Sequence, residues 1–109
     1  MTDTEVKEAK DHAKTRLGVF GWEESEFSSL EKLWEKESNW NYKAKNPKTG
    51  ALGIPQLIGG DKVPNYATDY KVQIEHGLSY IKNKKGKDKK PKYGSPTAAW
   101  NFHVKNGWY

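Results

Sequence analysis

The sequence has no cysteine among its 109 residues. Without thiols the chain can form no disulfide, and no thiolate can serve as a metal ligand or a nucleophile. The chain also has no apolar run long enough to cross a membrane or to form the hydrophobic region of a signal peptide. A role outside a cell would therefore need a delivery route other than a signal peptide in this sequence.

The sequence also has few hydrophobic residues. They make up 34% of the chain against 30% charged residues, a balance that leans toward disorder. The aromatic residues argue the other way, because five Trp, six Tyr and three Phe can bury a large area in a short chain. We therefore predict one domain over residues 1–109, with a modest core rich in aromatic side chains.

Basic residues outnumber acidic ones, giving a formal net charge of +5. Such a charge suits an anionic partner, whether nucleic acid, acidic lipid or an acidic cell wall, and does not choose among them. Many of the lysines fall in residues 82–92, which we expect to form a mobile, solvated loop.

Four segments have the periodicity or the start signals of helices. Asp3 or Thr4 can cap a first helix that ends near Leu17 and buries a narrow apolar stripe. A second helix can start at Ser28, which has capping-box spacing to Glu31, or at the rival Ser25. A third helix begins at the cap Asp69 and runs to about Lys82, with Val72, Leu78 and Ile81 on its apolar side. A fourth begins at the cap Ser95 and runs to about His103.

The second predicted helix places one carboxylate among its apolar residues. With Leu30 at zero on a helical wheel, Leu33 falls near 300°, Trp34 near 40° and Glu37 at about 340°. Burial disfavours a charged carboxylate, and the negative end of the helix dipole acts in the same direction. We therefore expect a raised pKa for Glu37, although a core Glu paired with a cation or a hydroxyl would show the same pattern.

Residues 43–68 are rich in glycine and proline and look irregular. Residues 46–50, Asn-Pro-Lys-Thr-Gly, are typical of a turn and are compatible with a short hairpin. Loops of this kind, held by a rigid scaffold, commonly build binding sites.

A series of short motifs resembles one known superfamily. Residues 34–41, WEKESNWN, are similar to the Glu-Ser segment that bears the acid in lytic transglycosylases and goose-type lysozymes. The similarity is closest to the short domains of actinobacterial cell-wall proteins and their phages, and it covers about residues 20–109. The other motifs follow in the family's order at suitable spacing: 46–47, 50–56, 77–82, 93–96, 98–101 and 107–109.

The resemblance implies a fold, a substrate and a reaction. The fold would be mainly α, of the α+β lysozyme-like kind, with a short β or turn segment flanking a substrate cleft. The substrate would be the glycan strand of bacterial peptidoglycan, and Glu37 would be the catalytic residue. The bond from N-acetylmuramic acid to N-acetylglucosamine would be cleaved without water, giving a 1,6-anhydro product.

The same resemblance assigns substrate-binding roles around Glu37. Ser38 would hydrogen-bond the substrate, and Gln56 would bind an acetamido group or the acid. Tyr80 would present its hydroxyl near Glu37. Trp100 and Asn101 would line the cleft, with Trp100 the better candidate for plain core packing.

The chain also departs from the family pattern. Residues 82–93 form a Lys-rich insertion between the third and fourth helices, and residues 101–105 differ from the common pattern. We therefore assign no role to His103. His12, His76 and His103 lack metal-ligand spacing, so neither a catalytic metal nor a cofactor is expected.

Three alternatives stay open at the level of sequence. A hydrolytic muramidase would need a second carboxylate, for which Asp61, Asp69 and Glu75 remain candidates. The second alternative is a non-catalytic module that binds the cell wall. The third is a basic nucleic-acid-binding protein that uses the lysine run, in which a buried Glu37 has no purpose.

The preferred hypothesis also sets the biological context. We expect a monomer that acts on the bacterial cell wall, with no nucleic-acid partner and no membrane span. Since no signal peptide is visible, the protein would be phage-encoded, in the virion or in lysis, or an excised domain of a secreted protein.

Overall fold

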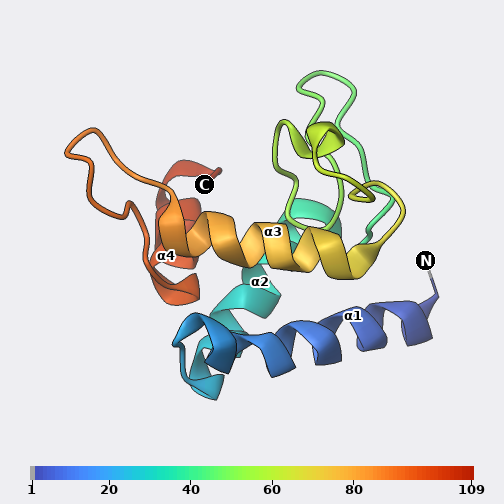
Figure 1. Ribbon diagram of the computed structural model, residues 1–109, viewed down its shortest axis with the longest axis horizontal. Coiled ribbons are helices and arrows are strands. Elements are labelled where there is room, and N and C mark those ends of the chain that lie inside the picture. Colours follow the sequence, from blue (N-terminus) through green and yellow to red (C-terminus); the bar gives the residue numbers. More distant parts are fainter. Residues whose placement is uncertain (1) are drawn as a thin grey trace.

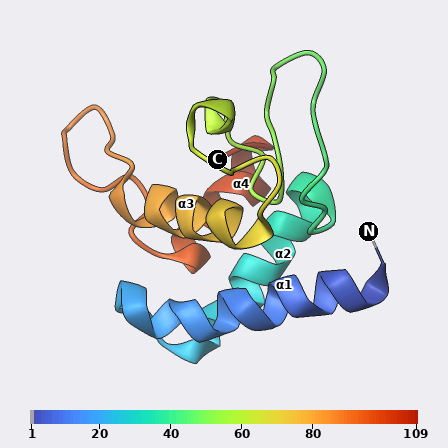
Figure 2. The ribbon, with the colours of Figure 1, turned by 45° about the vertical axis from the view of Figure 1, so that its right-hand side comes forward.

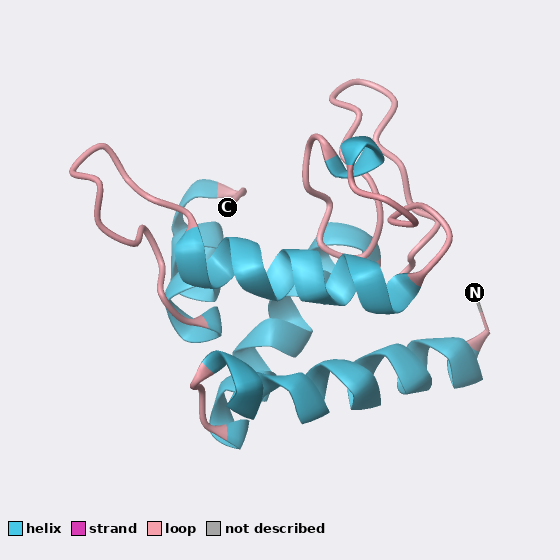
Figure 3. Ribbon diagram, in the orientation of Figure 1, coloured by secondary structure: helices cyan, strands magenta, loops and turns pink. Residues whose placement is uncertain are grey.

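The computed structural model describes residues 2–109, and the regular structure within them is helical (Figure 3). The helices are α1 (Asp3–Arg16), α2 (Phe27–Ser38), α3 (Tyr70–Asn83) and α4 (Pro96–Asn106). Short 3₁₀ helices at Leu17–Phe20, Glu24–Glu26 and Gly60–Lys62 complete the regular elements. The mainly α part of the predicted fold class is thus confirmed.

Helix α1 begins one residue earlier than the sequence suggested. Thr2 is its cap: the Thr2 hydroxyl accepts from the Glu5 amide, and the Glu5 carboxylate accepts from the Thr2 amide in return. This reciprocal capping box satisfies two exposed donors at once and outcompetes Asp3 and Thr4. The expected apolar stripe is buried at Ala9, Ala13 and Leu17 and partly buried at Val6.

Helix α2 starts without a serine cap, so both Ser25 and Ser28 were wrong as start signals. A 3₁₀ turn at Glu24–Glu26 leads directly into the helix. Instead of capping its own helix, the Glu26 carboxylate accepts hydrogen bonds from the amide and the hydroxyl of Thr97 on α4. A tertiary contact therefore sets this boundary, while the predicted buried side, including Leu30 and Trp34, is confirmed.

The predicted caps of the last two helices are confirmed. Asp69 accepts from the Lys71 amide at the start of α3, and Ser95 accepts from the Ala98 amide at the start of α4. Helix α4 continues one turn beyond His103, to Asn106. Gly107 ends it in the left-handed conformation, which glycine adopts without strain.

The segment between α2 and α3 contains turns and isolated bridges rather than strands within the described residues. Asn46 organises the predicted turn through its side-chain oxygen, which accepts from the amides of Lys48 and Thr49. Single antiparallel bridges join Lys45 to Leu52 and Leu52 to Leu57. The expected hairpin is thus reduced to bridges, and no regular β element flanks the helices in residues 2–109.

Helix α2 packs against α4, and α1 packs against α3. In both ribbon views α2 crosses the α1 and α3 helices (Figures 1 and 2). The irregular segment lies over the N-terminal half of α3, and the Lys-rich loop projects beyond the other end of α3 (Figure 1). No helix in residues 2–109 is both long enough and apolar enough to cross a bilayer.

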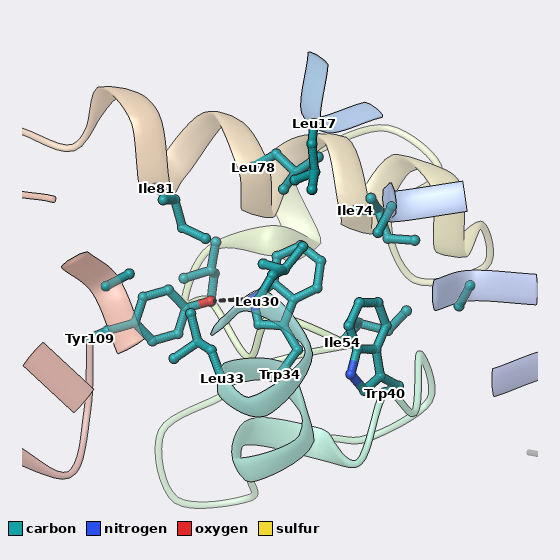
Figure 4. Packing of buried hydrophobic residues seen from close by; sticks show 14 of the residues in the cluster. Leu17, Leu30, Leu33, Trp34, Trp40, Ile54, Ile74, Leu78, Ile81 and Tyr109 are labelled. Carbon is teal, nitrogen blue, oxygen red and sulfur yellow. Dashed lines mark hydrogen bonds between the residues drawn. The ribbon is translucent and has the colours of Figure 1, made fainter. Parts of the chain in front are cut away.

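Trp34 lies at the centre of the core (Figure 4). Its indole nitrogen donates to the hydroxyl of Tyr109 at 3.0 Å, and that hydroxyl donates to the main-chain oxygen of Pro55 at 2.9 Å. Trp40 meets Trp34 edge-on, with ring centroids 5.2 Å apart. These hydrogen bonds connect the end of the chain and the irregular segment to Trp34, three residues before Glu37 on α2.

Candidate active site

Glu37 lies in the last turn of α2, on the side of the helix that packs into the protein. Its side chain is 17% exposed, and its Oε1 lies 2.8 Å from Nε2 of His103 on α4, which is 14% exposed. At the other end of α2, the Glu26–Thr97 hydrogen bonds hold the same two helices together. The carboxyl group is therefore positioned by a helix–helix contact and not by a flexible loop.

Burial raises the pKa of the Glu37 carboxyl above its ordinary value. The charge and the hydrogen bond of His103 act in the opposite direction but do not reverse this effect. A carboxyl that resists ionisation keeps its proton closer to neutral pH, which is what a general acid requires.

Glu37 opens onto a pocket of about 360 Å³. We call it the Glu37 pocket. The wall combines apolar groups with polar side chains from the irregular segment and from the end of the chain. The lining residues are Glu37, Asn46, Thr49, Ala51, Gln56, Ile58, Gly107, Trp108 and Tyr109. Glu37 is the only Asp or Glu among them.

Ser38 is next to the acid but has a main-chain partner. Its hydroxyl donates to the main-chain oxygen of Ile54 at 2.7 Å and lies 3.3 Å from that of Trp34. Ser38 does not line the Glu37 pocket. The contact joins the end of α2 to the irregular segment that forms one wall of the pocket.

Gln56 does lie in the pocket wall. Its amide nitrogen donates to the main-chain oxygens of Ala44 at 3.0 Å and Gly53 at 2.9 Å. Its backbone has a φ of +53°, a left-handed conformation that is uncommon outside glycine. The strained backbone and the paired nitrogen fix the direction of the side chain, and such strain is often found at binding sites.

Tyr80 lies behind the pocket rather than in it. Its hydroxyl lies 3.4 Å from the main-chain oxygen of Tyr109, and the two rings meet edge-on with centroids 5.6 Å apart. Burial raises the pKa of Tyr80 and, more strongly, that of Tyr109. The tyrosine that lines the pocket beside Glu37 is therefore Tyr109.

Trp100 and Asn101 take different positions on α4. Trp100 is half-buried and stacks on the ring of His103, with centroids 5.9 Å apart and planes 15° apart. Asn101 is exposed, and neither residue lines the Glu37 pocket. Trp100 thus supports the histidine that contacts the acid.

His103 is the functional candidate to which sequence reasoning assigned no role. It is separated from Glu37 by 66 residues, and its segment departs from the family pattern. The one available signal was its spacing, three residues after Trp100, which places both side chains on the same side of a helix.

No protein-family model, curated protein or solved structure that was compared with this chain matches it. Among residues 2–109, no cluster of three or more His, Cys, Asp or Glu side chains could hold a metal ion. The function must therefore be argued from the geometry of the site and from the resemblance of its motifs.

A larger cavity, of about 670 Å³, lies between α1 and α3. Its carboxylate, Glu75, forms an ion pair with Arg16. His12 and His76 also line it, and burial lowers the pKa of both. Size alone favours this cavity, but its carboxylate is already paired with Arg16, so we place the candidate chemistry at the Glu37 pocket.

Proposed function

We propose that this protein cleaves the glycan strands of bacterial peptidoglycan by lytic transglycosylation, with Glu37 as the single acid and base. One observation carries the proposal: a largely buried carboxyl with a raised pKa opens onto a pocket whose described lining includes no second Asp or Glu side chain. The motif resemblance supplies the substrate, and the flanking pocket is the candidate cleft.

The reaction has two proton transfers at one carboxyl group. Protonated Glu37 first donates its proton to the oxygen that links N-acetylmuramic acid to the next N-acetylglucosamine, and that bond breaks. The resulting Glu37 carboxylate then accepts the proton of the muramoyl 6-hydroxyl. At the same time the oxygen of that hydroxyl bonds to the anomeric carbon and closes the 1,6-anhydro ring. The nucleophile belongs to the substrate and is already close, so no positioned water is needed.

The distribution of carboxylates favours this route over hydrolysis. A hydrolase needs a second carboxylate to activate water or to attack the sugar. Asp69 caps α3 and Glu75 pairs with Arg16 in the other cavity, and neither they nor the exposed Asp61 line the Glu37 pocket. Hydrolytic cleavage remains the alternative, and the ends of the products distinguish it.

Gln56 is the best candidate for a direct contact with the sugar. Its amide nitrogen is already engaged with the main chain, so its amide oxygen is the group that can accept from the N–H of an acetamido group. Ser38, Tyr80 and Trp100 would act indirectly, by holding the pocket wall, Tyr109 and His103 in place.

The proposal is tested with purified peptidoglycan and two variants of the same helix. We expect Glu37→Gln to abolish the release of soluble glycan fragments, a loss of about a thousandfold or more, because the Gln amide has no acidic proton to transfer to the leaving oxygen. Glu35→Gln, at an exposed position, should release fragments at the wild-type rate. Equal activity of Glu37→Gln and the wild type would rule out the assignment, and wall binding without release by the wild type would favour a non-catalytic module.

A further inference from the structure

Two exposed apolar side chains lie in the wall of the Glu37 pocket. Among the described residues, the large hydrophobic side chains that remain exposed are Val19, Ile58, Val104 and Trp108. Ile58 is 74% exposed and Trp108 is 54% exposed, and both line the pocket that contains Glu37. Exposed apolar surface gathered at one concave site is typical of a contact with a ligand.

Trp108 is exposed but held in place. Its ring meets the Phe102 ring edge-on, with centroids 4.9 Å apart and planes 81° apart. The Lys92 ammonium lies 4.4 Å from the centroid of the Trp108 ring and 4.4 Å from that of Phe102. Such cation–π and edge-to-face contacts restrain an aromatic ring on the surface.

Lys92 connects this ring to the Lys-rich insertion. The Lys92 amide donates to the main-chain oxygen of Lys84, which closes the base of the loop. Inside the loop, Gly86 and Lys90 are joined by a further main-chain hydrogen bond. The insertion is therefore an ordered loop, and its Lys92 braces the pocket wall.

We propose that Trp108, braced by Phe102 and Lys92, is a platform on which the apolar face of a pyranose ring of an N-acetylhexosamine strand stacks. The identity of the strand rests on the proposed function. The C–H groups of a pyranose face carry partial positive charge, and the face of an indole carries partial negative charge, so the two attract. Ile58 adds apolar contact area in the same pocket.

The composition of the pocket favours a sugar over a protein helix or a lipid. Asn46, Thr49 and Gln56 lie in the same wall as Ile58 and Trp108. A sugar ring presents apolar faces and a rim of hydroxyl and acetamido groups, so it can satisfy both kinds of wall at once. An acyl chain or an apolar helix face would leave the polar groups unpaired, which is unfavourable.

The test uses tetra-N-acetylchitotetraose as the probe, with the Glu37→Gln protein as the reference so that no turnover occurs. Binding is followed by NMR shifts and by the protection of Trp fluorescence from a soluble quencher. Introducing Trp108→Ala into the Glu37→Gln protein should weaken binding of the tetrasaccharide about tenfold, a factor that corresponds to about 1.4 kcal/mol. Trp108→Phe should retain part of the affinity and guards against a loss that merely reflects misfolding.

Two matched controls isolate the platform and its brace. Val104→Ala removes an exposed apolar side chain on α4, outside the pocket, and should leave binding unchanged. Lys92→Met removes the cation but keeps the aliphatic stem, and should weaken binding by about twofold, a factor that corresponds to roughly half a kcal/mol. Lys87→Met, in the same loop, should have no effect.

The outcomes separate the platform from the catalytic proposal. Unchanged binding in Trp108→Ala, an equal loss in Val104→Ala, or no binding by the reference would overturn the platform, whatever the catalytic activity. Binding that depends on Trp108 in a wild type that releases no glycan fragments would sustain the platform and reject the proposed reaction.

Discussion

Glu37 and His103 share a hydrogen bond, and the position of its proton decides whether the two side chains are neutral or form an ion pair. A neutral carboxyl beside a neutral imidazole has the same number of protons as a carboxylate beside an imidazolium. Burial favours the uncharged form of Glu37, while His103 favours the carboxylate. The pair can thus supply a proton and then accommodate the carboxylate that is left, as the proposed acid and base steps require.

Removing His103 is expected to raise the pKa of Glu37 further. His103→Ala deletes both influences that lower this pKa and leaves the burial that raises it. The carboxyl group would then stay protonated to higher pH, so the basic limb of the kcat/KM profile should move upward in pH. Carboxyl ¹³C NMR reports the Glu37 titration directly and independently of activity.

Lys105→Ala, at an exposed position in the same last turn of α4, is the control for this change. It should leave the Glu37 titration in place. A Glu37 pKa that stays constant or falls in His103→Ala would contradict the proposed role of the pair.

Glu37 should also make folding stability depend on pH. Its folded pKa is raised above the unfolded value of about 4.3, so its contribution is fully present below that pH and is lost as the pH rises through the folded pKa. Glu37→Gln does not titrate and should gain stability relative to the wild type between pH 4 and pH 7. Thermal unfolding at both pH values measures the difference, and a constant difference would contradict it.

The direction of Glu37 could be predicted from the sequence because it depends on local geometry. The 100° step of a helix places it beside Leu30 and Leu33 whatever the rest of the chain does. The contact with His103 could not be predicted, since it depends on how α4 packs against α2. For the same reason Tyr80 was expected near the acid, whereas Tyr109 lines the pocket.

At the level of elements, one buried amide attaches the irregular segment to α3. The Gln73 side chain is fully buried: its oxygen accepts from the Ile54 amide at 2.8 Å, and its nitrogen donates to the main-chain oxygens of Tyr42 and Tyr66. Gly53 lies so close that a side chain there would clash with the amide. The wall of the Glu37 pocket therefore depends on a residue outside the pocket.

Replacing Gln73 by Ala is expected to destabilise the fold by about 3 kcal/mol, because three hydrogen bonds of roughly 1 kcal/mol each are lost. Urea unfolding followed by circular dichroism measures the change. Lys71→Ala, at an exposed position on the same helix, should change the free energy of unfolding by less than about 0.5 kcal/mol. An equal effect of the two substitutions would show that Gln73 does not hold the segment.

Helix boundaries were predictable where a cap acts on its own helix. Asp69 and Ser95 accept from amides two and three residues ahead, so their role can be seen in a few residues of sequence. The start of α2 was not predictable in this way, because Glu26 bonds to Thr97 on another helix. Gln73 was missed for a related reason: the apolar side of α3 was assigned from Val72, Leu78 and Ile81, but Val72 is only partly buried.

At the level of the whole molecule, the positive charge is the property most open to test. The chain has a net charge of +5, and the Lys-rich loop projects away from the helices (Figure 1). The loop is largely exposed, as expected, and it also has internal main-chain hydrogen bonds and a bridge between Lys85 and Pro91. Its charges can attract an anionic wall over about 10 Å at 0.1 M salt.

Replacing Lys84, Lys85, Lys89 and Lys90 by Gln should weaken adsorption to intact cell walls at low salt. The difference from the wild type should vanish at high salt, where surface charges are screened. Sedimentation with walls over a salt series measures it, and binding of the uncharged tetra-N-acetylchitotetraose is the internal control. If the same lysines instead governed tight binding to DNA with a steep salt dependence, the nucleic-acid alternative would be favoured.

The composition and periodicity of the sequence were sufficient to predict a mainly helical domain, but not how its parts meet. The aromatic core was expected from the number of rings. The hydrogen bonds from Trp34 to Tyr109 (Figure 4) and from Tyr109 to Pro55 join three distant segments and were not expected. The β segment was overestimated because turn residues predict a reversal of the chain and not the pairing of strands on either side of it.

The most direct test of the account is mass spectrometry of the fragments that the wild type and Glu37→Gln release from purified peptidoglycan. The account predicts muropeptides with 1,6-anhydro ends, lighter by one water than their hydrolysed counterparts, from the wild type and none from the variant. Fragments with reducing ends only would contradict the transglycosylase route, and the same fragments from both proteins would contradict the role of Glu37.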